Sequence, residues 1–292
     1  MSAPLDTHVD RRSFLHRASA LAAAATVGSV ALPSVAHAAP AATGTAPLVD
    51  VPVRSVDVSE LTIAEAATLI RQGRLKPEQL VEAYLDRIER FDSTYQAFNR
   101  VLAEAALDRA RALGRSRGGA LHGIPLAIKD NYYTRGVTTT ANSYLFADFV
   151  PPYDATAVRR LTAAGGIVLG KTQMGPLATT RATTPDGRIT TVNAWTPEDP
   201  STDPGGSSSG SATAVASRMA TSSVGTQTGG SITAPSNAQN LTGLKPTMGR
   251  VSLHGIVPLS YTRDHPGTLA RDALDAAIML TAMAGEDPDD PR

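Results

Sequence analysis

The chain has 292 residues, of which 27 are lysine or arginine and 27 are aspartate or glutamate, and it has no cysteine. A formal charge of zero argues against a nucleic acid as partner, because contacts to phosphates need a basic surface. The lack of cysteine excludes disulfides, a thiolate nucleophile and cysteine-ligated metal sites. The length suffices for a sizeable hydrophobic core, so we expect a globular chain.

The first 38 residues have the features of an export signal. Arg11 and Arg12 are followed by an Ala-rich apolar stretch over residues 18–32 and by Ala-His-Ala at residues 36–38. Paired arginines before such a stretch predict a signal peptide for the twin-arginine export machinery. We therefore expect cleavage near Ala38 and a periplasmic or extracellular protein. A membrane anchor is the alternative, but the stretch is shorter than the roughly 20 residues that a spanning helix needs.

Helices are predicted first along the remaining chain. Residues 39–57 are rich in Pro, Ala, Thr and Val and are expected to form an extended lead. A capping box at residues 62–65 predicts a helix to Gln72. Pro77 in a first turn predicts a second helix with one apolar face, and a third is expected over about residues 101–113.

Strands alternate with helices beyond Gly123. We expect strands over residues 124–128, 167–169 and 222–224, a helix capped by Asp154 and ending at Ala164, and helices over residues 211–220 and 269–284. Such alternation predicts an α/β fold with a mostly parallel, mixed sheet covered by helices. We expect one domain over residues 58–292.

Two short motifs match chemistry that their surroundings do not support. Residues 165–172 fit the P-loop pattern, but their middle is Ile-Val-Leu, which predicts a strand and not a phosphate-binding loop. Residues 206–210 fit the G-x-S-x-G pattern, which would make Ser208 a nucleophile at the elbow of an α/β-hydrolase. That elbow requires a preceding strand, whereas residues 201–205 are turn formers.

Two segments rich in serine and glycine, residues 205–212 and 225–232, each lead into a predicted helix. Together with residues 123–131, 243–252 and 264–271, they resemble the motifs of the amidase signature family, amide hydrolases with a Ser-cisSer-Lys triad. Several motifs in the same order make the resemblance specific. It extends over nearly all of the chain after the predicted signal.

The resemblance implies a role for each matching position. Ser231 matches the nucleophile, Ser207 the bridging serine, preceded by a cis peptide bond, and Lys129 the base. The backbone N–H groups of Thr228, Gly229, Gly230 and Ser231 match the oxyanion hole, where donors face a developing negative charge. The resemblance also implies a small-molecule or peptide amide as substrate, an acyl-enzyme at Ser231, and no metal or organic cofactor.

A lysine base is consistent with the composition, because the chain has no cysteine and only three of its six histidines lie beyond the predicted signal. Lys129 must be neutral to accept a proton, so burial must lower its pKa by about 3 from ~10.4. Alternatively, Lys129 is an ordinary lysine at a strand end that pairs with Asp130. Residues 205–211 could likewise be a flexible Gly/Ser linker, which explains neither Lys129 nor Ser231.

Some positions depart from the family pattern. Gln227 stands where many members have an acidic residue, Thr233 where many have arginine, and Asp203 where a neutral or basic residue is commoner. Thr233 and the export signal argue against a glutamine-processing amidotransferase subunit. Family domains continue past the helix that ends near Ala284, so we expect a domain incomplete at its C-terminus. Two functions follow: an exported amidase, or a non-catalytic truncated fragment or pseudoenzyme of the same family.

Overall fold

The computed structural model describes residues 50–54, 57–114 and 118–292. The predicted signal peptide and most of the predicted lead lie outside the described residues. Residues 50–54 form neither helix nor strand and lie against the first long helix, where the Arg54 N–H donates to Glu65 Oε1 (2.8 Å). Within the described ranges, no helix is long and apolar enough to cross a membrane.

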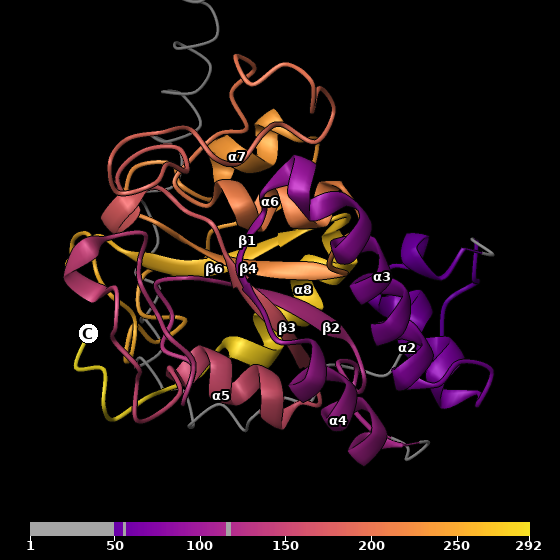
Figure 1. The fold of residues 1–292 in the computed structure, drawn as a ribbon. Coiled ribbons are helices and arrows are strands. Elements are labelled where there is room, and N and C mark those ends of the chain that lie inside the picture. Colours follow the sequence, from indigo (N-terminus) through magenta and orange to yellow (C-terminus); the bar gives the residue numbers. More distant parts are fainter. Residues whose placement is uncertain (1–49, 55–56, 115–117) are drawn as a thin grey trace, which may run out of the picture. The chain divides into compact units, whose positions relative to one another are not determined.

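A six-stranded sheet forms the centre of the fold, with the strand order β1-β3-β2-β4-β6-β5 (Figure 1). Its strands are β1 (Phe98–Val101), β2 (Pro125–Lys129), β3 (Ile167–Thr172), β4 (Ser222–Gln227), β5 (Thr242–Leu244) and β6 (His265–Ala270). β2 pairs in parallel with both β3 and β4, whereas β1 and β6 are antiparallel to their neighbours. β2, β3, β4 and β5 therefore run in one direction, which confirms the predicted mixed, mostly parallel sheet.

Helices cover both faces of this sheet. They are α2 (Ile63–Arg71), α3 (Pro77–Tyr95), α4 (Ala103–Leu113), α5 (Thr156–Ala163), α6 (Ser209–Ala216), α7 (Thr233–Ala238) and α8 (Ala273–Met283), with short 3-10 turns η1 (Val58–Glu60), η2 (Tyr144–Phe146) and η3 (Pro176–Ala178). In Figure 1, α6 and α7 lie above the strands, and α5 and α8 lie below them. The helical section before β2 was predicted, and α2 begins with the predicted capping box of Thr62 and Glu65.

Small side chains let α6 pack closely on the sheet. All eight of its residues are buried. A Cβ on Gly210 would lie 2.4 Å from the carbonyl oxygen of Ala97 and 2.6 Å from that of Gln173, so only glycine fits there. A buried helix that begins at Ser209 overturns the flexible linker as an interpretation of residues 205–211, because a linker would be solvated.

Several predicted boundaries are wrong. The helix predicted over residues 211–220 spans Ser209–Ala216. The third helix begins at Ala103, because Phe98–Val101 instead forms an edge strand antiparallel to β3. The helix predicted from Leu269 begins at Ala273, since His265–Ala270 is held as a strand between β4 and β5. Asp154 does not cap α5. Its Oδ1 accepts a hydrogen bond from the Arg135 N–H (2.7 Å), and the residue before the helix is Ala155, which has no capping side chain.

The two short motifs have the local structures that their surroundings indicated. The Ile-Val-Leu of residues 167–169 lies in β3, after α5, so residues 165–172 do not form a phosphate-binding loop. Residues 201–205, which precede the G-x-S-x-G match, contain no strand, and Ser208 is fully buried. An exposed elbow nucleophile is therefore absent at Ser208.

Candidate active site

Lys129 is the last residue of β2 and is fully buried. Its Nζ lies 2.8 Å from Ser207 Oγ, 2.9 Å from Ser208 Oγ and 2.9 Å from Thr226 Oγ1. β4 pairs in parallel with β2, and Ser207 and Ser208 immediately precede α6, which packs on both strands. The sheet and one helix end thus bring three hydroxyl groups around one amine.

Three hydroxyls and, at 3.4 Å, the Thr226 carbonyl oxygen lie around Lys129 Nζ. In its neutral form this amine has two N–H groups and one lone pair for these partners. Thr226 Oγ1 also accepts from Asn131 Nδ2 (3.2 Å), and the Ser208 hydroxyl donates to the Thr226 carbonyl (3.4 Å). Those two hydroxyls can therefore take both N–H groups of the amine. The lone pair is then free to accept the proton of the Ser207 hydroxyl.

Burial lowers the pKa of Lys129 to about 7, while the nearby carboxylate of Asp264 acts in the opposite direction. Removal from water disfavours the ammonium form, and a negative charge favours it. Asp264 is itself buried, and its Oδ2 accepts from the backbone N–H groups of Leu259 (2.8 Å) and Ser260 (3.1 Å). Near neutral pH, a large fraction of Lys129 is therefore in the form that can act as a base.

This pKa predicts the pH dependence of any reaction that uses Lys129 as a base. We expect kcat/KM to rise with pH and to reach half of its maximum near pH 7, because the ammonium form is inactive. Replacing Asp264 with Asn removes a charge that favours the ammonium, so the pKa of Lys129 falls and the acidic limb moves to lower pH. Profiles of kcat/KM from about pH 5 to about pH 9 measure this. An acidic limb at the same pH in the parent and in Asp264→Asn would show that Asp264 does not raise the pKa of Lys129.

The predicted alternative for Lys129, a pair with Asp130, is wrong. Asp130 is buried and pairs with Lys171 of β3, whose Nζ lies 3.1 Å from Asp130 Oδ1. Lys171 Nζ also donates to the Tyr132 carbonyl (2.8 Å) and to Thr139 Oγ1 (2.7 Å). Neighbouring residues at the end of a strand point to opposite faces, so Lys129 and Asp130 enter different polar clusters.

Ser207 lies at the centre of a tightly packed stretch of backbone. The peptide bond between Gly206 and Ser207 is cis, and the Ser207 carbonyl accepts from the Gly175 N–H (3.0 Å). A Cβ on Gly206 would lie 2.5 Å from the Thr180 carbonyl oxygen and 2.6 Å from the backbone of Arg181. The absence of a side chain at residue 206 is what lets the loop before α6 approach this neighbouring loop.

Ser231 lies in the turn between β4 and α7, which we call the Ser231 turn and define as residues 228–231. Ser231 is largely buried, with 9% of the residue exposed. Gly230 has a φ of 152°, which favours glycine, and a Cβ on Gly229 would have no atom within 4 Å. At the start of the turn, the Thr228 hydroxyl donates to Asp264 Oδ1. The turn assigned to an oxyanion hole therefore has open space beside Gly229.

Sequence reasoning did not give a role to Ser208, Thr226 or Asp264, which surround Lys129 or hold the Ser231 turn. Ser208 was considered only as an elbow nucleophile. The run of three serines at residues 207–209 was the one signal in the sequence for a role of Ser208, because Ser208 directly follows Ser207 at the start of the helix. The contacts of Thr226 and Asp264 depend on the pairing of β2 with β4 and of β4 with β6, which the sequence does not specify.

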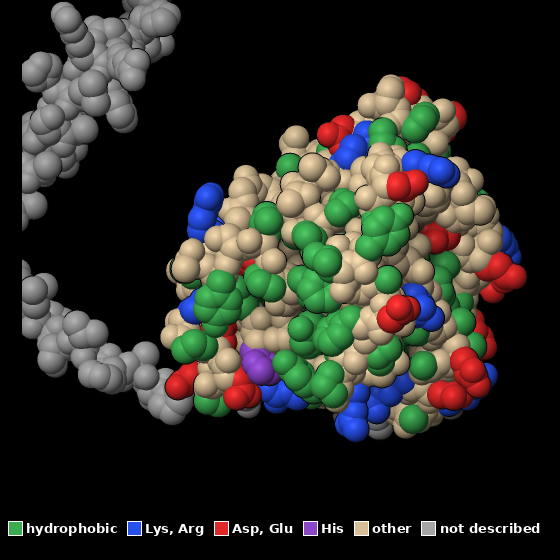
Figure 2. All heavy atoms as spheres, turned by 60° about the vertical axis from the view of Figure 1, so that its left-hand side comes forward, with side chains coloured by type: hydrophobic (Ala, Val, Ile, Leu, Met, Phe, Trp, Pro, Cys, Tyr) green, Lys and Arg blue, Asp and Glu red, His purple; other side chains and the backbone are tan. Residues whose placement is uncertain are grey.

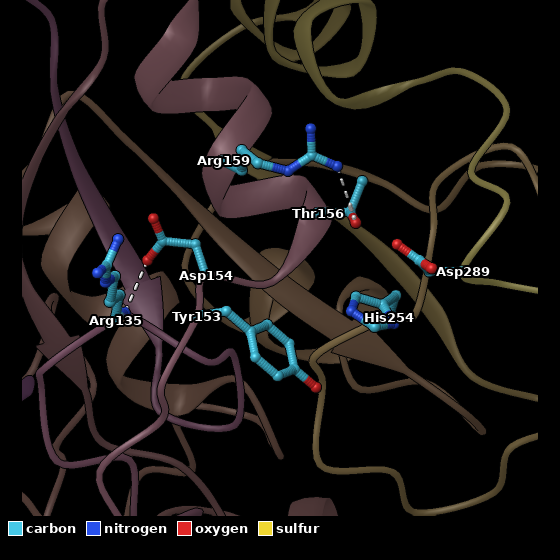
Figure 3. Close-up of a pocket in the computed structure, with 7 residues that line it drawn as sticks. All are labelled: Arg135, Tyr153, Asp154, Thr156, Arg159, His254 and Asp289. Carbon is cyan, nitrogen blue, oxygen red and sulfur yellow. Dashed lines mark hydrogen bonds between the residues drawn. The ribbon is translucent and has the colours of Figure 1, made fainter.

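A separate cavity of about 570 Å³ lies beside the first turn of α5 (Figure 3). The Tyr153 and His254 rings stack there, with centroids 5.1 Å apart. Its lining residues are Arg135, Tyr153, Asp154, Thr156, Arg159, His254 and Asp289. Lys129, Ser207 and Ser231 are not among them, so the cavity is distinct from the candidate active site. In the part of the chain that the structure describes, no group of three or more His, Asp or Glu side chains could hold a metal ion.

Exposed hydrophobic side chains occur in the loops that follow the central strands. Tyr144 and Leu145 in η2 are 71% and 80% exposed, and Trp195 is 59% exposed. Figure 2 shows a face on which hydrophobic side chains gather near the middle and charged side chains lie mostly toward the margins.

Comparisons with known proteins define the family. The family model described as Amidase matches residues 79–292. The chain is 43% identical over 233 residues to a Glutamyl-tRNA(Gln) amidotransferase subunit from Moorella thermoacetica, and the match covers 78% of this chain and 47% of that protein. It is 42% identical over 241 residues to a putative amidase, AmiD, from Mycobacterium tuberculosis, with 80% and 49% covered. This chain therefore belongs to the amidase family.

Solved structures agree with this assignment. The peptide amidase from Stenotrophomonas maltophilia superimposes with a TM-score of 0.74 at 40% identity, over 80% of this chain and 49% of that one. An amidase family protein from Bacillus anthracis gives 0.74 at 37% identity, with 80% and 48% covered. The chain spans about half the length of the curated relatives it matches.

Proposed function

We propose that this chain hydrolyses a carboxylic amide to the carboxylate and ammonia or an amine, through an acyl-enzyme at Ser231. The observation that carries the proposal is the contact of the buried Lys129 amine with Ser207 Oγ (2.8 Å), combined with a pKa for that lysine of about 7. Among the residues that the structure describes, the fully buried Lys129 amine contacts hydroxyl groups and one carbonyl oxygen and forms no ion pair, an arrangement that suits a base.

The proposed reaction has two halves. In the first, the Ser231 hydroxyl gives its proton to Ser207 Oγ as the Ser207 proton moves to Lys129 Nζ, and Ser231 Oγ bonds to the carbonyl carbon. The C–N bond then breaks as the leaving nitrogen takes a proton from the Ser207 hydroxyl, and Lys129 Nζ returns a proton to Ser207 Oγ. In the second half, water attacks the acyl group along the same relay, so that serine and neutral lysine are regenerated.

The oxygen of the tetrahedral intermediate carries a negative charge that needs donors. The backbone N–H groups of the Ser231 turn are proposed to supply them. Fixed backbone dipoles need no reorganisation during the reaction, and removing one such donor in a serine hydrolase costs about 10²–10³ in kcat. The open space beside Gly229 leaves room for a carbonyl oxygen to approach this turn.

The test uses the purified 292-residue chain with small aliphatic, aromatic and peptide amides. We expect the parent to release ammonia or amine, and Ser231→Ala to be slower by at least about 10³, because the covalent step is lost. Ser59→Ala is a matched control, since Ser59 is a buried serine in η1, outside the proposed relay. Equal release by the parent and Ser231→Ala would refute the proposal, and release by neither above the uncatalysed background would favour a non-catalytic member of the family.

A further inference from the structure

We propose that Gln227 is a positioning residue that holds the Ser231 turn in its reactive conformation, an inference that rests on the proposed function. Gln227 is the last residue of β4, so its backbone is fixed on one side by the sheet. It pairs with His265 of β6, and His265 Nδ1 lies 3.3 Å from the Gln227 carbonyl oxygen. The sheet therefore fixes the position of the Cα atom from which the Gln227 side chain extends.

From this point the Gln227 side chain reaches across the turn to the residues that follow Ser231. Its Oε1 accepts from the Ile232 N–H (3.0 Å), the Thr233 N–H (2.9 Å) and the Thr233 hydroxyl (3.2 Å). Two of these donors are backbone N–H groups, so the atom that receives them must be the amide oxygen and not the nitrogen. One side-chain atom thus joins the two ends of the Ser231 turn.

The turn has few other restraints on its outer side. Gly229 and Gly230 provide no side chains, and a Cβ on Gly229 would have no neighbour within 4 Å. The turn is held at its start by the Thr228 hydroxyl on Asp264, and after Ser231 by the three hydrogen bonds to Gln227. The Gly230 carbonyl also accepts from the Ala234 N–H (2.7 Å) and the Thr233 hydroxyl (3.3 Å). Glycine-rich backbone loses more conformational freedom on ordering than other backbone, so the turn depends on these few contacts, those of Gln227 included, for its preorganisation.

A fixed turn matters for the reaction because its N–H groups and Ser231 must meet the same carbonyl group. Loosening the turn misplaces both the donors and the nucleophile, which lowers the rate of the chemical step more than it weakens substrate binding. A structural role alone would lower the stability of the fold and leave kcat per folded molecule unchanged. The two roles are therefore separable by experiment.

The experiment compares Gln227→Leu, which removes the acceptor at similar size, with Gln227→Glu, which keeps an acceptor oxygen. Gln79→Leu is the matched control, because Gln79 Oε1 accepts from the Lys76 N–H (3.0 Å) at the start of α3. Hydrogen exchange is measured at the amides of Ile232 and Thr233 in the full chain, and kcat and KM are measured on the best amide of the panel.

In Gln227→Leu we expect exchange at both amides to be faster by about tenfold, the effect of one lost hydrogen bond of ordinary strength. We expect kcat to fall by at least about tenfold with KM within about twofold. Gln227→Glu should restore the protection, and Gln79→Leu should leave both amides and kcat at parent values.

Unchanged exchange in Gln227→Leu would overturn the inference, and so would faster exchange with an unchanged kcat. A parent without Ser231-dependent hydrolysis would instead refute the proposed function, and the exchange data would still decide whether Gln227 holds the turn.

Discussion

Lys129→Met is expected to lower kcat/KM for amide hydrolysis by about 10²–10⁴, the usual contribution of a general base. Methionine has a similar length and no lone pair that accepts the Ser207 proton. The residual rate should also lose the acidic limb near pH 7, since the group with that pKa is gone. Steady-state kinetics across pH, normalised to folded protein, measures both effects.

A second lysine provides the control for this substitution. Lys245 is exposed, and within the described residues its Nζ donates to the neighbouring Pro246 carbonyl (3.1 Å). Lys245→Met should therefore keep the kcat/KM and the pH profile of the parent. If Lys129→Met retained a large part of the parent activity with the same acidic limb, Lys129 would not be the base.

Lys171→Met is expected to lower the free energy of unfolding by about 3–5 kcal/mol, because it leaves the buried Asp130 carboxylate without its cation. Asp130 Oδ2 would keep its hydrogen bonds from Asn99 Nδ2 (2.9 Å) and the Thr140 hydroxyl (2.6 Å), while Oδ1 would have no partner. Urea unfolding at neutral pH measures the loss. It should be accompanied by little change in the pH at which activity is half-maximal, because Lys171 does not belong to the Lys129 cluster.

The partner substitution separates loss of the ion pair from loss of packing. Lys171→Met combined with Asp130→Leu removes both charges, so part of the stability should return. Lys245→Met, which removes an exposed lysine, should change the free energy of unfolding by no more than about 0.5 kcal/mol. A Lys171→Met variant as stable as the parent would show that the Asp130–Lys171 pair contributes nothing net to the fold.

Local signals were enough to predict the helices that begin with them. The capping box at Thr62 and the proline at Pro77 each place a helix start to within one residue, because caps act on backbone groups a few positions away. β1, β5 and β6 were missed for a different reason. Phe98–Val101 has one buried residue and three that are not, and His265–Ala270 precedes a long apolar run. Pairing with other strands decides all three segments, β5 included through its pairing with β6, and no local pattern encodes that pairing.

The candidate site also has a part that could be predicted from the sequence and a part that could not. The cluster of Lys129 with Ser207 was expected from the resemblance of motifs, and the burial that a neutral lysine requires was expected from the apolar strand around it. The remaining members were not expected. Thr226 contacts Lys129 because of the register of β2 against β4. Asp130 pairs with Lys171, and not with Lys129, because Lys171 lies on the neighbouring strand β3. These contacts join residues that are far apart in the sequence.

The central claim is that Ser231 is the nucleophile, and covalent labelling tests it most directly. The 292-residue chain is treated with a fluorophosphonate, digested, and analysed by mass spectrometry to locate the modified residue. We predict one adduct, on Ser231, which is lost in Ser231→Ala and forms much more slowly in Lys129→Met. An adduct on another serine, such as Ser208, or labelling that Ser231→Ala leaves unchanged, would contradict the account.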